Sequence, residues 1–237
     1  MGTAGGLGRK GTADGEIPRD LIVEGLHRLG VEPDPAALDG LVLHLEQVLL
    51  WSRRMDLVKV ADTRDLVVRH LLDSVAAVQT LRALIEKIGA PAPRLCDVGS
   101  GAGFPGVPLA LCLPIPDVIL LERSARRATF LKTVCALERR DGLTVWDRDL
   151  DGVARDGERF DLVVTRALSP FGDEAVTSLA RITSPRGALL IYQGREDTAA
   201  HTRDRLAERF ISVEMIETEV PFLAAERRLV IAATPRD

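Results

Sequence analysis

From Arg94 onward, short strand-forming runs alternate with helical segments, and this alternation limits the possible fold more than any other feature of the sequence. The predicted strands are Leu95–Val98, Val118–Leu121, Leu143–Trp146, Phe160–Thr165, Ala188–Tyr192, Ser212–Glu219 and Leu229–Ala233. Helices are predicted between them near Pro105–Cys112, Ala125–Arg139, Asp173–Ile182 and Ala199–Arg209. Such alternation is typical of a parallel sheet with helices on both faces. We therefore predict a doubly wound, seven-stranded, mostly parallel α/β sheet.

Both ends of the chain depart from this alternation. The last two predicted strands leave no room for a crossover helix, so we expect an antiparallel hairpin at one end of the sheet. Before Arg94, apolar periodicity predicts helices near Leu21–Leu29 and Pro35–Arg53, and a third from the Asp62-Thr63 cap to Gly89. Six of the first fifteen residues are glycine. We therefore divide the chain into a flexible tail (1–17), a helical extension (18–92) and an α/β domain (93–237).

Composition excludes several classes of protein. Hydrophobic residues make up 46% of the 237 residues and charged residues 28%, which is typical of a globular chain and not of a disordered one. The net charge of −4 means that contact with nucleic acid would need a local basic patch. No CxxC, HExxH or long apolar segment free of Gly and Pro occurs, so we expect no metal site and no membrane span. A reducing cytoplasm fits three cysteines without a disulfide pattern.

A glycine-rich turn leaves the first predicted strand and enters a helix. Its sequence is Asp97-Val98-Gly99-Ser100-Gly101-Ala102-Gly103-Phe104-Pro105-Gly106. In an open parallel sheet, ligands bind at the carboxyl ends of the strands, where glycines let the backbone approach them closely. A dinucleotide fingerprint, GxGxxG, begins directly after its strand, whereas here Gly99 takes that place and gives GxGxG. The register therefore favours S-adenosylmethionine over a dinucleotide.

A carboxylate ends the second predicted strand, at Glu122. It lies 122 − 99 = 23 residues beyond the first glycine of the turn. A carboxylate in that position can accept hydrogen bonds from both ribose hydroxyls of an adenosyl group. The turn and Glu122 together predict a site for an adenosyl cofactor.

Several stretches make the chain resemble the glucose-inhibited division protein B family, bacterial methyltransferases that act on N7 of one guanosine in small-subunit (16S) ribosomal RNA. These stretches are Val68–Ser74 (VRHLLDS), Asp97–Pro108, Leu121–Ser124 with Arg127, Phe130 and Leu131, Thr165–Ala167, and Glu226–Val230. They occur in the family's order over about Pro35 to Ala233. The resemblance implies a Rossmann-like, S-adenosylmethionine-dependent methyltransferase whose substrate is the RNA or the assembled 30S subunit.

The resemblance also implies roles for particular residues. It implies that the cofactor contacts Gly99, Phe104, Glu122, Asp149, Leu150 and Arg166. From the residues themselves we also expect the cofactor to contact Asp97, Ser100, Gly101 and Gly103 of the turn, and the substrate to contact Arg69, His70, Arg127 and Phe171. Two stretches differ from the usual pattern, namely Trp51-Ser52 with Asp56-Leu57-Val58, and Gln193-Gly194. Both lie on the expected substrate side, so the resemblance predicts the cofactor more directly than the RNA target.

The chemistry of the acceptor can be narrowed from the residues. Enzymes that methylate exocyclic amines usually carry an Asn/Asp-Pro-Pro-aromatic run after the fourth strand, where this chain has Thr165-Arg166-Ala167-Leu168. Methylation of pyrimidine C5 needs a nucleophilic cysteine, yet all three cysteines fall in the first strand or on helices that cross over the sheet. Guanine N7 presents a lone pair and no proton, so it needs no general base.

Basic residues that could contact phosphates fall in two sets. The first is Arg53, Arg54, Lys59, Arg64 and Arg69, and the second is Arg123, Arg126, Arg127, Lys132, Arg139 and Arg140. Arg69 and Asp73 are spaced as an i, i+4 ion pair, and Arg166 is expected at the cofactor or a phosphate, or in an ion pair with Asp149 or Asp173. The residues alone leave open a small-molecule methyltransferase, a nucleotide-binding oxidoreductase and a non-catalytic adenosyl sensor.

Overall fold

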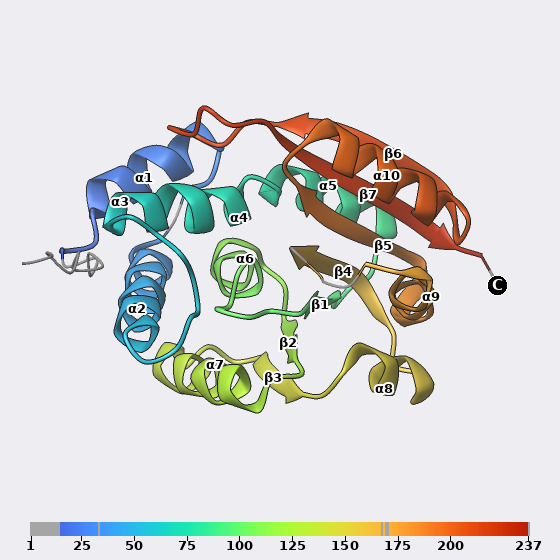
Figure 1. Ribbon diagram of the computed structural model, residues 1–237, viewed down its shortest axis with the longest axis horizontal. Helices are drawn as coiled ribbons and strands as arrows, with labels where there is room; N and C mark the ends of the chain where they lie inside the picture. The colour runs from blue at the N-terminus through green and yellow to red at the C-terminus, as the bar shows by residue number, and fades with distance from the viewer. Residues whose placement is uncertain (1–14, 33, 167, 169–170, 237) are drawn as a thin grey trace, which may run out of the picture.

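The computed structural model describes residues 15–32, 34–166, 168 and 171–236. These residues form one seven-stranded sheet in the order β3-β2-β1-β4-β5-β7-β6 (Figure 1). The strands are β1 (Arg94–Val98), β2 (Asp117–Glu122), β3 (Leu143–Asp147), β4 (Phe160–Arg166), β5 (Thr183–Gln193), β6 (Phe210–Thr218) and β7 (Arg227–Pro235). The first five strands are all parallel to one another. The predicted doubly wound, mostly parallel sheet is confirmed.

The predicted antiparallel hairpin is present, with its second strand inside the sheet. β7 pairs antiparallel with β6 and also antiparallel with β5, so it lies between them and leaves β6 at the edge. β5 begins at Thr183, five residues before its predicted start, and its pairing with β4 shifts register between Phe160 and Leu162. Pro185 and Gly187 had hidden this first part of the strand, because neither residue is typical of strand interiors.

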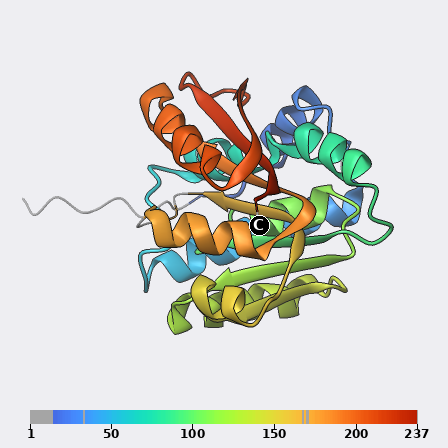
Figure 2. The same cartoon turned by 90° about the vertical axis from the view of Figure 1, so that its right-hand side faces the viewer.

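Alternate residues of the strands face two separate hydrophobic clusters, as pleating requires. On one face Leu95, Leu120 and Leu162 join a cluster with residues of the N-terminal helices and of α6 (Gly106–Cys112) and α7 (Ala125–Glu138). On the other face Cys96 and Val163 join a cluster with α8 (Leu150–Arg155), α9 (Asp173–Ile182) and α10 (Glu196–Ala207). Figure 2 shows α8, α9 and α10 at the near side of the sheet. The helix α8 was not predicted, because its six residues include Gly152 and are too few for a periodic pattern.

The N-terminal helices pack directly on the sheet. They are α1 (Arg19–Arg28), α2 (Pro35–Ser52), α3 (Thr63–Leu66), the π-helical segment η1 (Val67–Leu72), α4 (Asp73–Val75) and α5 (Val78–Ile88). The predicted third helix has its expected ends, the Asp62 cap and Gly89, but is not continuous: a π-helical segment follows α3, and a turn at residues 76–77 separates α4 from α5. Ile17, placed in the predicted tail, is buried in the shared cluster, whereas residues 1–14 of that tail lie outside the described residues. Within the described residues, no helix is long and apolar enough to cross a membrane.

Because helical extension and sheet share one cluster, they should unfold together. Leu71 of η1 is fully buried in that cluster. We expect Leu71→Ala to destabilise the protein by about 2–5 kcal/mol, the usual cost of truncating a buried leucine. Leu50→Ala, at an exposed position of α2, is the matched control and should cost well under about 1 kcal/mol. Chemical denaturation measures both. Two separate transitions, with only one shifted by Leu71→Ala, would contradict a shared core.

Candidate functional site: a glycine-rich loop at the carboxyl end of the sheet

The glycine-rich loop is held against the neighbouring strand by backbone hydrogen bonds. The amides of Gly99 and Ser100 both donate to the carbonyl of Leu121 in β2, at 2.9 and 3.1 Å. Gly101 has φ +60°, and among the described residues a Cβ there would meet only the Gly99 carbonyl oxygen, at an ordinary 3.7 Å. Glycine at position 101 is therefore required by the left-handed backbone rather than by a close neighbour.

Glu122, at the end of β2, accepts hydrogen bonds from the glycine-rich loop and from the turn that follows its own strand. Its Oε2 accepts from the Gly101 amide at 2.9 Å and its Oε1 accepts from the Ser124 amide at 2.8 Å. The side chain is almost fully buried, yet it lines a pocket. A carboxylate has about four acceptor positions, so two remain after these bonds for the hydroxyls of a ligand.

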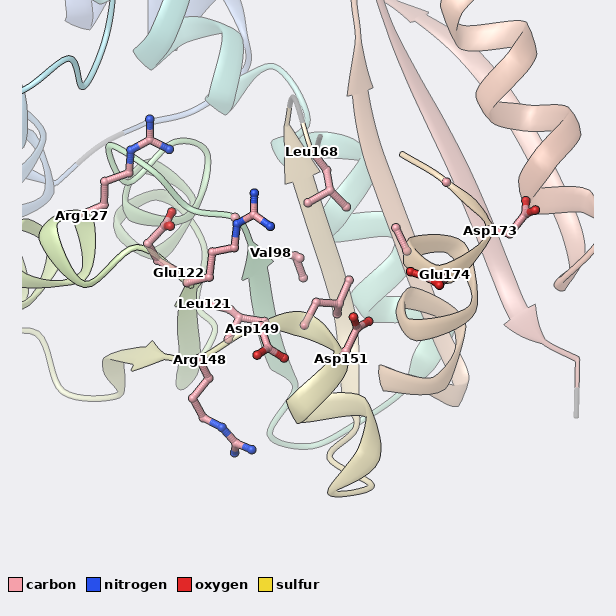
Figure 3. A pocket seen from close by; sticks show the side chains of 15 residues that line it. Val98, Leu121, Glu122, Arg127, Arg148, Asp149, Asp151, Leu168, Asp173 and Glu174 are labelled. Carbon is pink, nitrogen blue, oxygen red and sulfur yellow. The ribbon is translucent and has the colours of Figure 1, made fainter. Parts of the chain in front are cut away.

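This pocket has a volume of about 550 Å³, within the range of small-molecule sites (Figure 3). Of the residues predicted from the sequence, Gly99, Glu122, Asp149, Leu150 and Arg127 line it. Asp149 also caps α8, since its Oδ1 accepts from the Gly152 amide at 2.6 Å. Figure 3 shows Glu122 and Arg127 on one side of the pocket and Asp173 and Glu174 of α9 on the other.

Sequence reasoning missed the rest of the lining. The additional residues are Val98, Leu121, Arg123, Arg148, Asp151, Leu168, Gly172, Asp173, Glu174 and Ala175. Most come from the turns that begin α8 and α9. The cap signals at Asp149 and Gly172 could have located both turns at the carboxyl edge of the sheet, where ligands bind.

Behind the loop, Asp97 is fully buried at the end of β1. Its Oδ2 accepts from the Gly106 amide at 2.9 Å. Among the described residues, Asp97 Oδ1 and the Ser100 hydroxyl make no hydrogen bond of good geometry. Burial raises the pKa of Asp97 to about 6, although the nearby Ser100 hydroxyl and the Gly106 amide oppose this. Asp97 thus holds the start of α6 against the end of β1.

Arg166 lies in a second cluster, which is not part of the pocket lining. Its Nη1 donates to Asp73 Oδ2 at 3.1 Å and its Nη2 donates to His70 Nδ1 at 3.1 Å. The guanidinium also lies 5.4 Å from the centre of the Phe104 ring. The alternative ion pair with Asp149 or Asp173 is wrong, because the partner is Asp73 on the helical extension.

Asp73 holds a second arginine as well. Arg227 at the start of β7 donates through Nε to Asp73 Oδ1 at 2.7 Å. The predicted pair of Arg69 with Asp73 is wrong, since Arg69 instead bonds Asp65, one helical turn earlier. Burial and the charge of Arg166 lower the pKa of His70 to about 4, so its ring is neutral and accepts from Arg166.

The remaining predicted residues are not part of the pocket lining, although Phe171 directly precedes Gly172, which is. Arg69 is exposed on η1, and Phe171 is half-buried and packs against the cluster of α8 to α10. Ser52 has a buried hydroxyl without a partner among the described residues, and Asp56 is exposed. Gln193 donates to the Thr202 hydroxyl of α10 at 3.0 Å, and Ala167 lies outside the described residues.

The sheet order, the glycine turn and the carboxylate after β2 define a Rossmann-like, S-adenosylmethionine-dependent methyltransferase. Solved structures agree on the fold. N-methyltransferase NodS from Bradyrhizobium japonicum, in complex with S-adenosyl-L-homocysteine, superposes with TM-score 0.56 at 16% identity over 80% of this chain and 99% of its own. A T. thermophilus 16S rRNA N2 G1207 methyltransferase superposes with TM-score 0.51 at 18% identity, over 68% of this chain and 43% of its own.

Sequence comparison identifies the family. Residues 38–231 match the GidB model, described as rRNA small subunit methyltransferase G, and the chain belongs to this family. Ribosomal RNA small subunit methyltransferase G of Treponema pallidum is 33% identical over 91% of this chain and 94% of its own. The protein of that name from Symbiobacterium thermophilum is 34% identical over 94% of this chain and 92% of its own. The family and the cofactor predicted from the sequence are confirmed, which excludes the oxidoreductase.

The geometry of Glu122 leads to a first prediction for the site. In Glu122→Gln the amide nitrogen would face a backbone N–H, and the charge at the ribose position would be lost. We expect S-adenosylhomocysteine to bind less tightly by about 1–3 kcal/mol, the range for hydrogen bonds to a charged group. Calorimetry with the 2′-deoxyadenosyl analogue separates the two causes. The analogue should lose less affinity than the parent ligand, and an equal loss for both would argue against ribose contact. Glu158→Gln, just before β4 and outside the pocket lining, is the control.

The shared carboxylate leads to a second prediction. Asp73→Asn leaves Arg166 and Arg227 half-buried without their counter-charge, so we expect a loss of about 3–5 kcal/mol in unfolding free energy. Asp65→Asn in the nearby α3 is the matched control, because its pair with Arg69 is more exposed and should contribute under about 1 kcal/mol. Denaturant titration compares the two variants. Equal losses would mean that Asp73 does not join the extension to the sheet.

Proposed function

We propose that this chain methylates N7 of a guanosine in small-subunit ribosomal RNA, in the cytoplasm. The observation that carries the proposal is family membership over most of the chain, joined to a cofactor pocket with a basic surface beside it. The predicted cofactor and RNA contacts, and the predicted absence of metal, are part of this proposal. The described residues contain no group of three or more His, Cys, Asp or Glu side chains placed to hold a metal ion.

The pocket residues divide the binding of the cofactor among them. S-adenosylmethionine supplies a methyl group on a positively charged sulfur, ready for in-line displacement by a lone pair. Glu122 would bind the ribose hydroxyls, and Asp149 and Leu150 would contact the adenine. Gly99 would lie against the methionine portion. The main task of these residues is to align donor and acceptor at about 3–3.5 Å.

The charges of the pocket suit a cationic ligand. Its lining carries five carboxylates (Glu122, Asp149, Asp151, Asp173 and Glu174) against three guanidinium groups (Arg123, Arg127 and Arg148). An excess of negative charge favours a sulfonium and also the cationic 7-methylguanine product. Arg166 would oppose that product if its charge were free, and its pairing with Asp73 reduces this effect.

The side chains support guanine N7 as the methyl acceptor only indirectly. Methylation of N7 removes no proton and so needs no general base. The thiol route to pyrimidine C5 is disfavoured, because burial raises the pKa of Cys112 to about 12 and of Cys135 to about 11, and Cys96 is buried within β1. These thiols stay protonated at neutral pH and are poor nucleophiles.

A basic surface adjoins the pocket and would contact RNA phosphates. Arg126 of α7 donates to the Arg54 carbonyl at 3.4 Å, which brings the two predicted basic sets together at the end of α2. Arg127, one residue further along α7, lines the pocket. Exposed guanidinium groups of this kind position RNA through its phosphates and carry no base selectivity of their own.

The proposal is tested by methyl transfer from tritiated S-adenosylmethionine. Small-subunit ribosomal RNA lacking the modification should accept label, either as naked RNA or as the 30S subunit. Borohydride reduction followed by aniline should then cleave the chain at one guanosine. RNA transcribed with 7-deazaguanosine has carbon in place of N7, so it should accept no label.

Two substitutions test whether Arg166 contributes to methyl transfer. Arg166→Ala should lower the rate of methyl transfer at least tenfold, about 1.4 kcal/mol. Arg186→Ala, at an exposed position of β5, should not. Incorporation into 7-deazaguanosine RNA would overturn the N7 assignment. Binding of S-adenosylhomocysteine without incorporation into any ribosomal substrate would instead favour a small-molecule methyltransferase or an adenosyl sensor.

A further inference from the structure

His44 of α2 contacts the glycine-rich loop from the helical extension. It is fully buried, and its Nε2 lies 2.8 Å from the carbonyl oxygen of Ala102, at the centre of the loop. The contact joins residues 58 positions apart in the sequence. No pattern in the sequence indicates it, because His44 forms no motif with the other histidines.

The partner of His44 determines where its proton lies. A carbonyl oxygen can only accept, so Nε2 must carry hydrogen and donate. Burial lowers the pKa of His44 to about 4, and the ring is therefore neutral at physiological pH. Nδ1 then has a lone pair, and among the described residues it has no hydrogen-bond partner. The ring thus makes one directed hydrogen bond, to the loop.

The loop is shaped to receive this ring. Gly103 has φ +85°, and a Cβ at that position would lie 2.8 Å from His44 Nε2 and 2.9 Å from Val107 Cγ2. The Phe104 ring lies 4.6 Å from the His44 ring on one side and 5.3 Å from the His70 ring on another. His44 therefore contacts three successive loop residues, Ala102 to Phe104.

We propose that His44 is a positioning residue for the cofactor: its Nε2–H fixes the Ala102 carbonyl, and so holds the loop in the conformation that binds S-adenosylmethionine. The loop then has three anchors, which are the Leu121 carbonyl, the Glu122 carboxylate and His44. The first two come from β2, and the third comes from the helical extension. The proposal rests on the cofactor binding at this loop.

A role in core packing alone would not account for the histidine. A neutral imidazole buried with one unpartnered nitrogen is less favourable than an apolar ring of similar size. The hydrogen bond to Ala102 is the interaction that an apolar ring could not replace. Substitution of His44 should therefore affect cofactor affinity more than it affects folding.

The test compares two substitutions that fill the same space. His44→Phe removes the N–H and retains a ring, whereas His44→Gln retains a side-chain N–H that can reach the Ala102 carbonyl. Calorimetry should show S-adenosylhomocysteine binding at least fivefold more weakly to His44→Phe, and within twofold of the parent for His44→Gln. At saturating S-adenosylmethionine, the KM for ribosomal RNA should be unchanged in both variants.

Leu45→Ala is the control, since Leu45 is the neighbouring buried residue of α2. It should lower the melting temperature without weakening cofactor binding. The proposal would be overturned if His44→Phe lowered only the melting temperature and left cofactor affinity unchanged. It would also be overturned if His44→Phe and His44→Gln weakened cofactor binding equally. A parent protein that binds no S-adenosylhomocysteine would instead contradict the function proposed above.

A second measurement uses the unmodified protein and so does not depend on any variant folding. Long-range ¹⁵N–¹H correlation spectra of the histidine rings distinguish the two neutral tautomers. We expect His44 to carry its proton on Nε2, with slow exchange of that proton against solvent. A proton on Nδ1, or rapid exchange, would remove the hydrogen bond and with it the proposal.

Discussion

Asp73 is the buried carboxylate through which the helical extension, β4 and β7 are connected. Burying a charge costs several kcal/mol unless it is paired, and Asp73 is paired with two guanidinium groups, one from the central strand β4 and one from β7. Next to it, the Tyr192 hydroxyl of β5 donates to the Ser74 carbonyl at 2.7 Å. Three adjacent strands therefore hold one short helical segment, which fixes η1 and His70 beside the loop.

The helical extension consequently packs directly against the glycine-rich loop. Two of its histidines contact Phe104 from different segments, His44 from α2 and His70 from η1. Both rings are neutral because burial lowers their pKa, so they serve as hydrogen-bond partners and packing surfaces rather than as charges. The loop thus lies between a sheet that supplies its backbone and a helical layer that limits its movement.

Sequence reasoning succeeded where the signal is local. The turn from Gly99 to Gly106 and the carboxylate of Glu122 lie at strand ends that hydrophobic runs reveal, so the cofactor, the fold and the order of elements followed from them. Sequence reasoning failed where the two residues of an ion pair lie far apart in the sequence. Asp73 lies 93 residues from Arg166 and 154 from Arg227, and helical spacing suggested Arg69 instead. Short elements such as α8 and the π-helical turn at η1 also escaped, because six residues give too little periodicity.

The place of β7 in the sheet has a consequence for synthesis of the chain. β7 is the last strand in the sequence, yet it lies between β5 and β6. A nascent chain that has not yet released β7 therefore has an open edge at β5 and no partner for β6. It also lacks Arg227, so Asp73 is only half neutralised. The support of α4 by three adjacent strands is therefore complete only once β7 has been made and has paired with β5.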